Sequence, residues 1–280
     1  MDELQIDPVA INHPAGEPIL VGSSQPLLLI GGPCALESEE IARQVAGTLK
    51  EICGRLGISY VFKASFDKAN RTSLSSYRGP GLKEGLAILA RIRNELAVPV
   101  ISDIHEVSQV EKAAEVLDIL QIPAFLCRQT DLLVAAARTG KPVSIKKGQF
   151  VSPWDMANAV NKLHGAGSRS IMLVERGASF GYNNLVVDMR SLPVMRALGC
   201  PVIYDATHSV QLPGGAGGSS GGQREFIVPL ARAAMAIGID GLFMEIHPQP
   251  EKALCDGPNS LPLDGIEPVL SQLLRIRAAL

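Results

Sequence analysis

Residues 98–124 read VPVISDIHEVSQVEKAAEVLDILQIPA and contain one complete unit of the pattern that decides the fold. The run 98–105 is short, apolar and rich in β-branched residues, and it predicts a strand. Segment 106–116 has the apolar spacing of a helix, and 119–124 predicts the next strand. This order of strand, helix and strand is typical of a parallel sheet covered by helices.

The same unit repeats along the whole chain. Strands are predicted at 27–32, 60–66, 98–105, 119–124, 143–150, 170–176, 202–208 and 241–247. Helices are predicted at 39–56, 81–96, 106–116, 129–139, 152–165, 189–199, 224–238 and 264–279. Eight strands, each followed by a helix, favour a closed (β/α)₈ TIM barrel over an open sheet. A chain of 280 residues suits one barrel or two smaller domains, and with no visible boundary we predict a single domain over 1–280.

Two segments fall outside the repeating pattern. Runs 6–11 and 18–23 flank the turn sequence NHPAG, and they predict an N-terminal hairpin within residues 1–25 that closes the bottom of the barrel. The Gly/Ser-rich stretch LPGGAGGSSGGQR (212–224) lies between the seventh strand and its helix. Because barrel segments stand on both sides, a mobile active-site loop is favoured over a linker.

Composition excludes several classes of protein. A net charge of −2 argues against a general affinity for nucleic acid or membrane surfaces. Uninterrupted apolar runs of about 18 residues are absent, so no transmembrane helix is predicted, and the first residues do not resemble a signal peptide. The five cysteines are scattered and odd in number, which fits reduced thiols and a cytoplasmic location.

Ionisable residues follow almost every predicted strand. A single one is usually a solvated residue, but charges within strands are costly unless they are paired or face a ligand. The C-terminal ends of barrel strands are also where barrel enzymes hold their chemistry. Five cations are predicted to meet in one mouth: Lys63, Lys68, Arg128, Lys146 and Arg176.

Such a group of cations repels itself unless anions neutralise it. Salt bridges to Asp67, Asp103 and Glu175 would explain some of the five but not all. Lysine and arginine are the side chains that bind phosphate and carboxylate. We therefore predict a substrate with both groups, or two phosphorylated substrates.

A second group is predicted from strands that neighbour one another in a closed barrel. It contains Cys34, His208, Glu245 and Asp256. A thiolate, an imidazole and two carboxylates suit a borderline divalent ion such as Zn²⁺, Fe²⁺ or Mn²⁺. The residues form no short metal motif, so the spacing alone leaves the site open.

Six longer motifs occur in one order: YVFKASFDKANRTS (60–73), SYRGPGL (76–82), LQIPAFLCRQTDLL (120–133), IKKGQFVSP (145–153), ERGASFGYNNLVVDM (175–189) and CDGPNSLPL (255–263). Together they resemble the 3-deoxy-D-manno-octulosonate 8-phosphate (KDO 8-phosphate) synthase family, from Gly31 to the last helix. The resemblance implies a (β/α)₈ transferase, typically a homotetramer. It implies condensation of phosphoenolpyruvate with D-arabinose 5-phosphate and water, giving KDO 8-phosphate and inorganic phosphate for lipopolysaccharide biosynthesis.

The resemblance also implies roles for single residues. Lys63, Arg128, Lys146 and Arg176 would bind phosphoenolpyruvate, and Asn70, Arg71 and Thr72 would bind the pentose phosphate, with Arg71 reaching a neighbouring subunit's site. Lys68 would lie between the substrates, and Asp103, His105 and Gln121 would line the pocket near the reacting carbons. The resemblance further implies that Ser65 binds substrate and that His208 is catalytic. The implied chemistry is attack of the enol C3 on the aldehyde, addition of water at C2, and C–O cleavage.

The family has two branches that differ at the position of Cys34. The branch with cysteine binds a divalent ion through the equivalents of His208, Glu245 and Asp256, and the branch with asparagine works without metal. Cys34 implies Mn²⁺, Fe²⁺ or Zn²⁺, whereas CDGP (255–258) resembles the metal-independent branch. Whether the ion is required or dispensable stays open.

Three other functions are consistent with parts of the sequence. DAHP synthase, which uses erythrose 4-phosphate, usually reads Lys-Pro-Arg-Thr where this chain reads KANRT (68–72), and the additional Asn70 favours the five-carbon acceptor. A Schiff-base aldolase with Lys63 or Lys146 as the nucleophile stays possible, because neighbouring cations depress a lysine pKa. A non-catalytic sugar-phosphate binding protein would have little use for Asp103 and His105.

Overall fold

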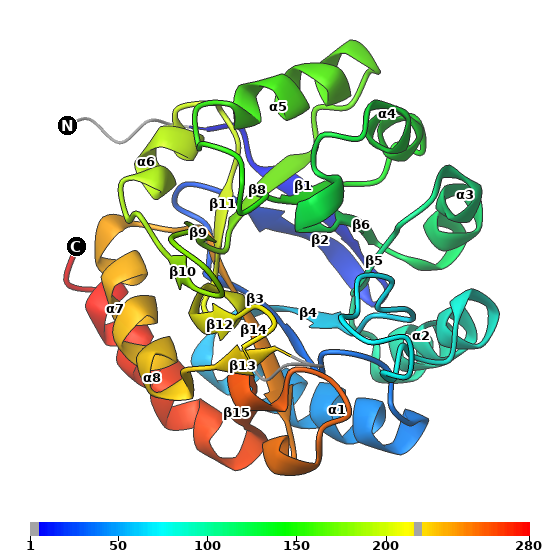
Figure 1. The fold of residues 1–280 in the computed structure, drawn as a ribbon, viewed down its shortest axis with the longest axis vertical. Coiled ribbons are helices and arrows are strands. Elements are labelled where there is room, and N and C mark those ends of the chain that lie inside the picture. Colours follow the sequence, from blue (N-terminus) through cyan, green and yellow to red (C-terminus); the bar gives the residue numbers. More distant parts are fainter. Residues whose placement is uncertain (1–5, 216–219) are drawn as a thin grey trace.

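The structure is a computed structural model that describes residues 6–215 and 220–280. At its centre is a ring of parallel strands: β3 (Leu28–Gly32), β4 (Ser59–Lys63), β5 (Val100–Asp103), β6 (Ile119–Ile122), β7 (Val143–Lys146), β8 (Ile171–Glu175), β11 (Val202–Asp205) and β14 (Gly241–His247). Each strand pairs with the next along the chain, and β14 pairs with both β11 and β3, which closes the ring. The predicted (β/α)₈ barrel is confirmed (Figure 1).

The helices form an outer layer around this ring (Figure 1). They are α1 (Glu39–Leu56), α2 (Leu82–Leu96), α3 (Val107–Val116), α4 (Thr130–Arg138), α5 (Met156–Gly165), α6 (Ser191–Arg196), α7 (Ile227–Ile237) and α8 (Ile266–Arg277). Helix α1 shows how the sequence sets the limits of one of them. The Ser38 side chain accepts a hydrogen bond from Ile41 N at its start, and Gly57 ends it with a left-handed φ of 66°.

Shorter elements lie in the connections. The strands are β9 (Ala178–Ser179), β10 (Leu185–Val186), β12 (Gln211–Leu212), β13 (Gly221–Gly222) and β15 (Leu261–Pro262). The 3-10 helices are η1 (Ala124–Leu126), η2 (His208–Val210), η3 (Arg224–Phe226), η4 (Pro250–Lys252), η5 (Gly257–Asn259) and η6 (Leu263–Gly265). No helix of the described residues is long and apolar enough to cross a membrane.

The predicted hairpin is confirmed as β1 (Val9–His13) and β2 (Gly16–Val21), which pair antiparallel. Its buried side chains Val9, Ile11 and Val21 pack against barrel-interior residues such as Leu28 and Ile101. In Figure 1 the hairpin, drawn in dark blue, lies across the ring of strands. The barrel interior therefore has an apolar layer at the hairpin end, and its charged residues lie at the opposite end.

Several strands are shorter than predicted, and the difference falls on the residues of the site. Strands β4 and β7 end at Lys63 and Lys146, whereas the apolar pattern continues to 66 and 150. Beyond Lys63 the chain leaves the barrel ladder, and Ser65 pairs with the segment after β3 through its N–H to Cys34 O at 3.3 Å. After β4 the apolar pattern continues because residues 64–66 stay buried above the barrel, whereas after β7 Phe150 is 61% exposed.

The described part of the predicted loop 212–224 is folded over the C-terminal end of the barrel. Strands β12 and β13 pair antiparallel, with Leu212 opposite Gly221. A Cβ atom on Gly222 would lie 1.4 Å from Asn259 Oδ1, so only glycine fits there. Residues 216–219 of the predicted mobile loop lie outside the described residues.

Candidate active site

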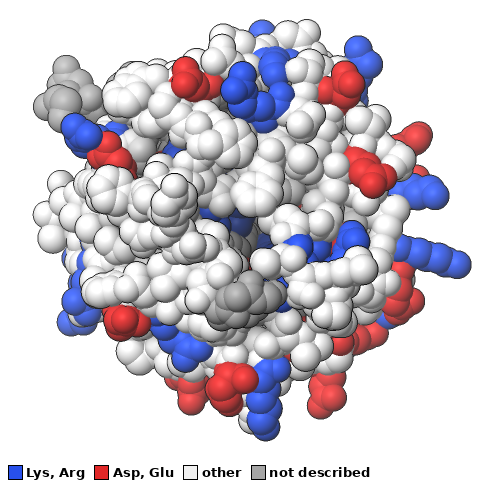
Figure 2. Space-filling model, viewed as in Figure 1, with Lys and Arg blue, Asp and Glu red and all other residues white. Residues whose placement is uncertain are grey.

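A cavity opens at the C-terminal ends of the barrel strands, and we call it the mouth. Residues that line it include Lys68, Arg71, Asp103, Lys146, Arg176 and Asp256. Figure 2 shows it as a hollow near the centre of this face, with Lys and Arg atoms at its depth. The strand ends therefore bring most of the predicted site residues together.

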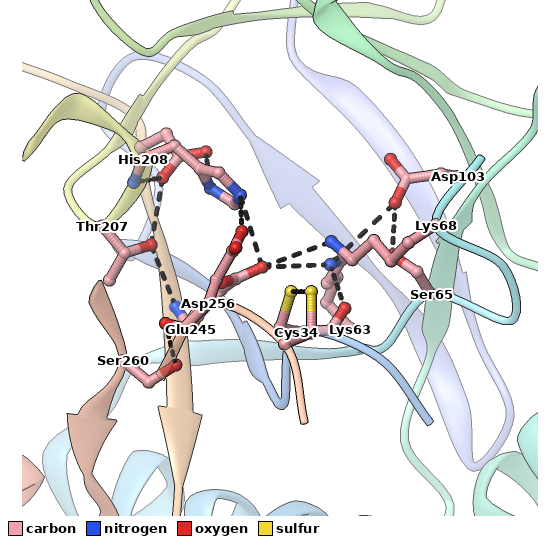
Figure 3. Close-up of polar contacts among 12 residues, drawn as sticks. Cys34, Lys63, Ser65, Lys68, Asp103, Thr207, His208, Glu245, Asp256 and Ser260 are labelled. Carbon is pink, nitrogen blue, oxygen red and sulfur yellow. Dashed lines mark hydrogen bonds and ion pairs between the residues drawn. The ribbon is translucent and has the colours of Figure 1, made fainter. Parts of the chain in front are cut away.

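Two lysines share one carboxylate beneath the mouth. Lys63 is 1% exposed, and its Nζ donates to Cys34 O at 2.9 Å and lies 3.5 Å from Glu245 Oε1. Lys68 Nζ lies 3.5 Å from the same oxygen (Figure 3). Burial opposes protonation of Lys68, but the nearby carboxylates of Glu245 and Asp103 help to raise its pKa well above the ordinary lysine value. Lys68 is therefore a cation at neutral pH.

A third lysine is held by a different carboxylate. Lys146 Nζ lies 2.8 Å from Asp205 Oδ2, and His208 Nδ1 lies 2.8 Å from the same oxygen. Burial alone would raise the pKa of Asp205, but His208 and Lys146 lower it well below its ordinary value. The Lys146 ammonium also lies 3.7 Å from the centre of the Phe243 ring.

The carboxylates change the predicted account of the cations. Asp205, Asp103, Glu245 and Asp256 accompany the cations of the mouth. The predicted partners Asp67 and Glu175 instead pair with Arg78 and Lys147. Much of the predicted repulsion is therefore neutralised within the chain, by the predicted partner Asp103 and by three acids that the prediction had not paired with these cations.

Arg176 is a buried cation that the described residues satisfy only in part. It is 4% exposed, and its Nη2 donates to Gln211 Oε1 at 2.9 Å. Its Nη1 is buried and has no hydrogen-bond partner among the described residues. A buried guanidinium nitrogen without a partner at a cavity wall is suited to bind an anionic ligand.

Asp103 is the centre of a polar network on another side of the mouth. It accepts hydrogen bonds from Ser65 Oγ and, at 2.5 Å, from Gln121 Nε2. Burial alone would raise its pKa, but Lys63 and Lys68 lower it far below its ordinary value. Burial lowers the pKa of His105, whose Nδ1 has no hydrogen-bond partner among the described residues. Asp103 is therefore an anion and His105 a neutral imidazole at neutral pH.

The residues of the predicted pentose-phosphate site lie at the rim. Asn70, Arg71 and Thr72 all line the mouth. Arg71 Nη1 donates to Cys255 Sγ at 2.8 Å and lies 3.5 Å from Asp256 Oδ1. The guanidinium of Arg71 lies in the mouth of its own chain, beside the thiol and the carboxylate that follow β14.

Arg128 lies outside the mouth, and the prediction that it converges with the other four cations was wrong. Its side chain is exposed and lines a separate cavity with Phe150 and Asp155. The 3-10 helix η1 directs Phe125 toward the mouth, and the chain then turns Arg128 away from it. The spacing of residues along the sequence does not predict this turn.

The predicted metal ligands form two groups that share one carboxylate. Asp256 lies with His208 and Glu245 in one group, and with Cys34 and Cys255 in the other. Within each group the ligand atoms all lie within 4.8 Å of one another. Asp256 has a left-handed φ of 49°, a strained conformation that places its carboxylate between the groups (Figure 3).

The donor set fits a divalent ion. Both carboxylate oxygens of Glu245 are buried without a hydrogen-bond partner among the described residues. Burial alone would raise the pKa of Glu245, but His208 and Lys68 lower it to about 2, so the carboxylate is ionised. Buried anionic oxygens beside an imidazole and a thiol are the ligands that borderline divalent ions prefer.

Two residues of the site were not assigned a role from the sequence. Asp205 stands at the end of a predicted strand, and its position could have indicated a partner for Lys146. Cys255 precedes Asp256 directly, but its closeness to Cys34 depends on the turn after β14, which no sequence period reveals.

Comparisons with known proteins show the family to which the chain is similar. A model of the DAHP synthetase I family matches residues 6–278. The chain is 76% identical over 274 residues to a Desulfotalea psychrophila protein named 2-dehydro-3-deoxyphosphooctonate aldolase, with 98% of each chain covered. It is 64% identical to proteins of the same name from Syntrophotalea carbinolica and Geobacter metallireducens, over 93% of this chain and 94% and 96% of theirs.

Proposed function

The chain belongs to the DAHP synthetase I family, and we propose that it condenses phosphoenolpyruvate with D-arabinose 5-phosphate and water, giving KDO 8-phosphate and inorganic phosphate. The name shared by its relatives supports this activity. The observation on which the proposal rests is that Lys68, Lys146 and Arg176 line one cavity. Two phosphorylated substrates are the ligands such a cavity suits.

Phosphoenolpyruvate would be bound by the cations deepest in the mouth. Lys146 and Arg176 hold its phosphate and carboxylate, and Lys63 adds positive charge from below. The unpartnered Nη1 of Arg176 supplies a donor that no group of the described chain uses. Preorganised donors of this kind stabilise developing charge by about 3 kcal/mol each.

The reacting carbons would lie between Lys68 and Asp103. The Lys68 ammonium polarises the aldehyde oxygen as the enol C3 attacks the aldehyde carbon, and it gives a proton to the alkoxide that forms. Asp103 stays ionised and stabilises the positive charge that develops at C2, and Ser65 and Gln121 hold its carboxylate in place. Neutral His105 accepts a proton from the water that adds at C2, and C–O cleavage then releases phosphate.

Asn70, Arg71 and Thr72 would bind the phosphate of the pentose at the rim. Arg128 cannot reach the mouth of its own chain, so a substrate-binding role requires the mouth of a neighbouring copy. We therefore assign Arg71 to its own site and Arg128 to a shared one, within a homotetramer. The reaction would supply lipopolysaccharide biosynthesis in the cytoplasm.

Cys34, His208, Glu245 and Asp256 would hold a divalent ion, Mn²⁺, Fe²⁺ or Zn²⁺. When bound, the ion supplies Lewis acidity, which orients the water and increases its acidity. Two lysine cations already lie beside one of these ligands, because Lys63 and Lys68 both form ion pairs with the Glu245 carboxylate. These lysines partly neutralise Glu245 without an ion, so the ion can aid the reaction without being strictly required.

The assay that tests the proposal measures phosphate released from phosphoenolpyruvate with each of two aldoses. We expect turnover with arabinose 5-phosphate to exceed that with erythrose 4-phosphate by at least tenfold, on the order of 1.4 kcal/mol. The reverse preference would identify a DAHP synthase. Borohydride treatment with substrate present tests the Schiff-base alternative, and we expect no covalent adduct because Lys146 is held by Asp205 and Lys63 lies beside Glu245.

A further inference from the structure

Cys34 and Cys255 come from opposite ends of the chain and meet below the rim of the mouth. Each is 2% exposed, and their Sγ atoms lie 2.8 Å apart (Figure 3). Both are free thiols. Together with Asp256 they form a group of three metal-capable side chains. The predicted ligand set includes Cys34 and Asp256 but not Cys255.

The backbone around Cys255 is fixed on both sides, so the direction of its sulfur is determined by the fold. On one side, Leu254 N donates to Glu37 Oε1 at 2.9 Å. On the other side, Asp256 has the left-handed conformation, and a Cβ on Gly257 would lie 2.4 Å from Pro250 O. The close packing of Gly257 fixes the turn that directs both the thiol and the carboxylate toward Cys34.

The contacts of the Cys255 sulfur show which chemistry it can perform. Arg71 Nη1 donates to it at 2.8 Å, and a guanidinium can only donate hydrogen bonds. The sulfur therefore already acts as an electron-pair donor toward a cation. The oxygens of Glu245, which accept no hydrogen bond from the described residues, lie buried beside the same carboxylate, Asp256, which both groups share.

We propose that Cys255 is a further metal ligand of the site, so that two thiolates, Cys34 and Cys255, bind the ion beside the Asp256 carboxylate that both groups share. This inference rests on the metal site of the proposed function. Thiolates favour soft and borderline ions, so a second one selects Zn²⁺ over Mn²⁺. Two thiolates on one tetrahedral zinc ion stand about 3.8 Å apart, so the sulfurs need to separate by only about 1 Å.

The closeness of Cys34 and Cys255 also changes how the motif CDGP (255–258) is interpreted in this chain. Because this motif resembles the metal-independent branch, the sequence leaves open whether the ion is required. With Cys34 opposite, the same cysteine adds a ligand, and the ion is held more tightly. The prediction is therefore a higher affinity for Zn²⁺ in the wild type than in a chain that lacks the Cys255 thiol.

The first measurement uses the wild-type full chain and needs no variant. The protein is loaded with Zn²⁺ under argon, without added thiol, and X-ray absorption counts the sulfur neighbours of the ion. We expect two sulfurs. A single sulfur, or failure of the wild type to bind Zn²⁺, would overturn the proposal.

The second measurement compares Cys34→Ser, Cys255→Ser and the control Cys53→Ser, which replaces a buried thiol of α1. During titration with Co²⁺, the thiolate-to-cobalt absorbance per bound ion should fall by about half in each of the first two variants. It should be unchanged in the control. The affinity of Cys255→Ser for Zn²⁺ should fall about tenfold or more. Unchanged absorbance and affinity in Cys255→Ser would contradict the proposal.

Phosphate release is measured on the same preparations to separate the two conclusions. If the ion has two sulfur neighbours but no phosphate is released with either aldose, the proposed function fails and the thiolate pair stands. If phosphate is released but only one sulfur is found, the proposed function stands and the assignment of Cys255 fails.

Discussion

The Asp205 carboxylate holds the Lys146 ammonium at 2.8 Å, beneath the mouth. Oδ2 of Asp205 also lies 2.8 Å from His208 Nδ1, so one acid orients a cation and an imidazole at once. Asp205 is fully buried and does not line the mouth, so it is a positioning residue.

Asp205→Asn should therefore lower kcat more than it changes KM. An amide cannot form an ion pair with Lys146, and the buried ammonium then loses its charge partner. We expect kcat to fall about 100-fold, with the KM for arabinose 5-phosphate changed by less than threefold. Steady-state phosphate release measures both, with Asp264→Asn, at an exposed residue of η6, as the control. Equal changes in kcat and KM would assign Asp205 to substrate binding instead.

Lys147 should be required for stability. It is 2% exposed, lies 3.4 Å from Glu175 Oε1 and donates to Gly177 O at 3.3 Å. Lys147→Met leaves Glu175 buried and unpaired, so the free energy of unfolding should fall by about 3–5 kcal/mol. Urea unfolding measures it against Lys112→Met on the exposed face of α3. A loss below 1 kcal/mol would mean that Glu175 finds another partner.

Arg128 should act on a mouth other than its own. Arg128→Ala and Arg176→Ala should each be nearly inactive alone. When the two chains are co-expressed, about a quarter of the mouths combine an intact Arg176 with an intact neighbouring Arg128, if assembly is random. Activity should return to that fraction of the wild type. A mixture no more active than its parts would show that the sites are not shared.

The Asp103 network should make stability depend on pH. The pKa of Asp103 is lower in the folded chain than in the unfolded chain, where it is about 3.9. Its ionised form therefore stabilises the fold fully above pH 4, and this contribution is lost as the pH falls further. The wild type should be more stable than Asp103→Asn at pH 7, and the difference in their free energies of unfolding should be smaller at pH 3. Urea midpoints measure this difference, with Asp131→Asn as the control. A difference that does not change with pH would contradict the assignment.

Removing the metal should lower the activity. Treatment with a chelator, followed by dialysis, should reduce phosphate release at least tenfold if the ion orients the water. Adding Mn²⁺ or Zn²⁺ should restore it, and elemental analysis should follow the same course. Full activity in a preparation shown to lack metal would mean that the ion is dispensable.

The sequence predicted the barrel well because its periodic signal is strong. Helix α1 and strand β14 have the predicted bounds, since apolar spacing and end residues agree in both. The site was predicted less completely. Arg128 shares a motif with Phe125, yet after the turn at η1 Phe125 lines the mouth and Arg128 lines a separate cavity.

Contacts between distant segments were the other limit of prediction. Cys34 and Cys255 are 221 residues apart, and nothing in their local sequences fixes a distance between them. Asp205 stood among the strand-end acids, but only the register of the closed ring shows that it faces Lys146. Residue types were predictable, whereas pairings depended on the closed fold.

The hairpin β1–β2 offers a point of attachment to a surface. Its turn, with exposed Ala15, lies at the end of the barrel opposite the mouth. All five native cysteines are buried, so a maleimide would react selectively with a cysteine introduced at position 15. Molecules tethered in this way would all present the mouth to the bulk liquid, which suits single-molecule recording of turnover.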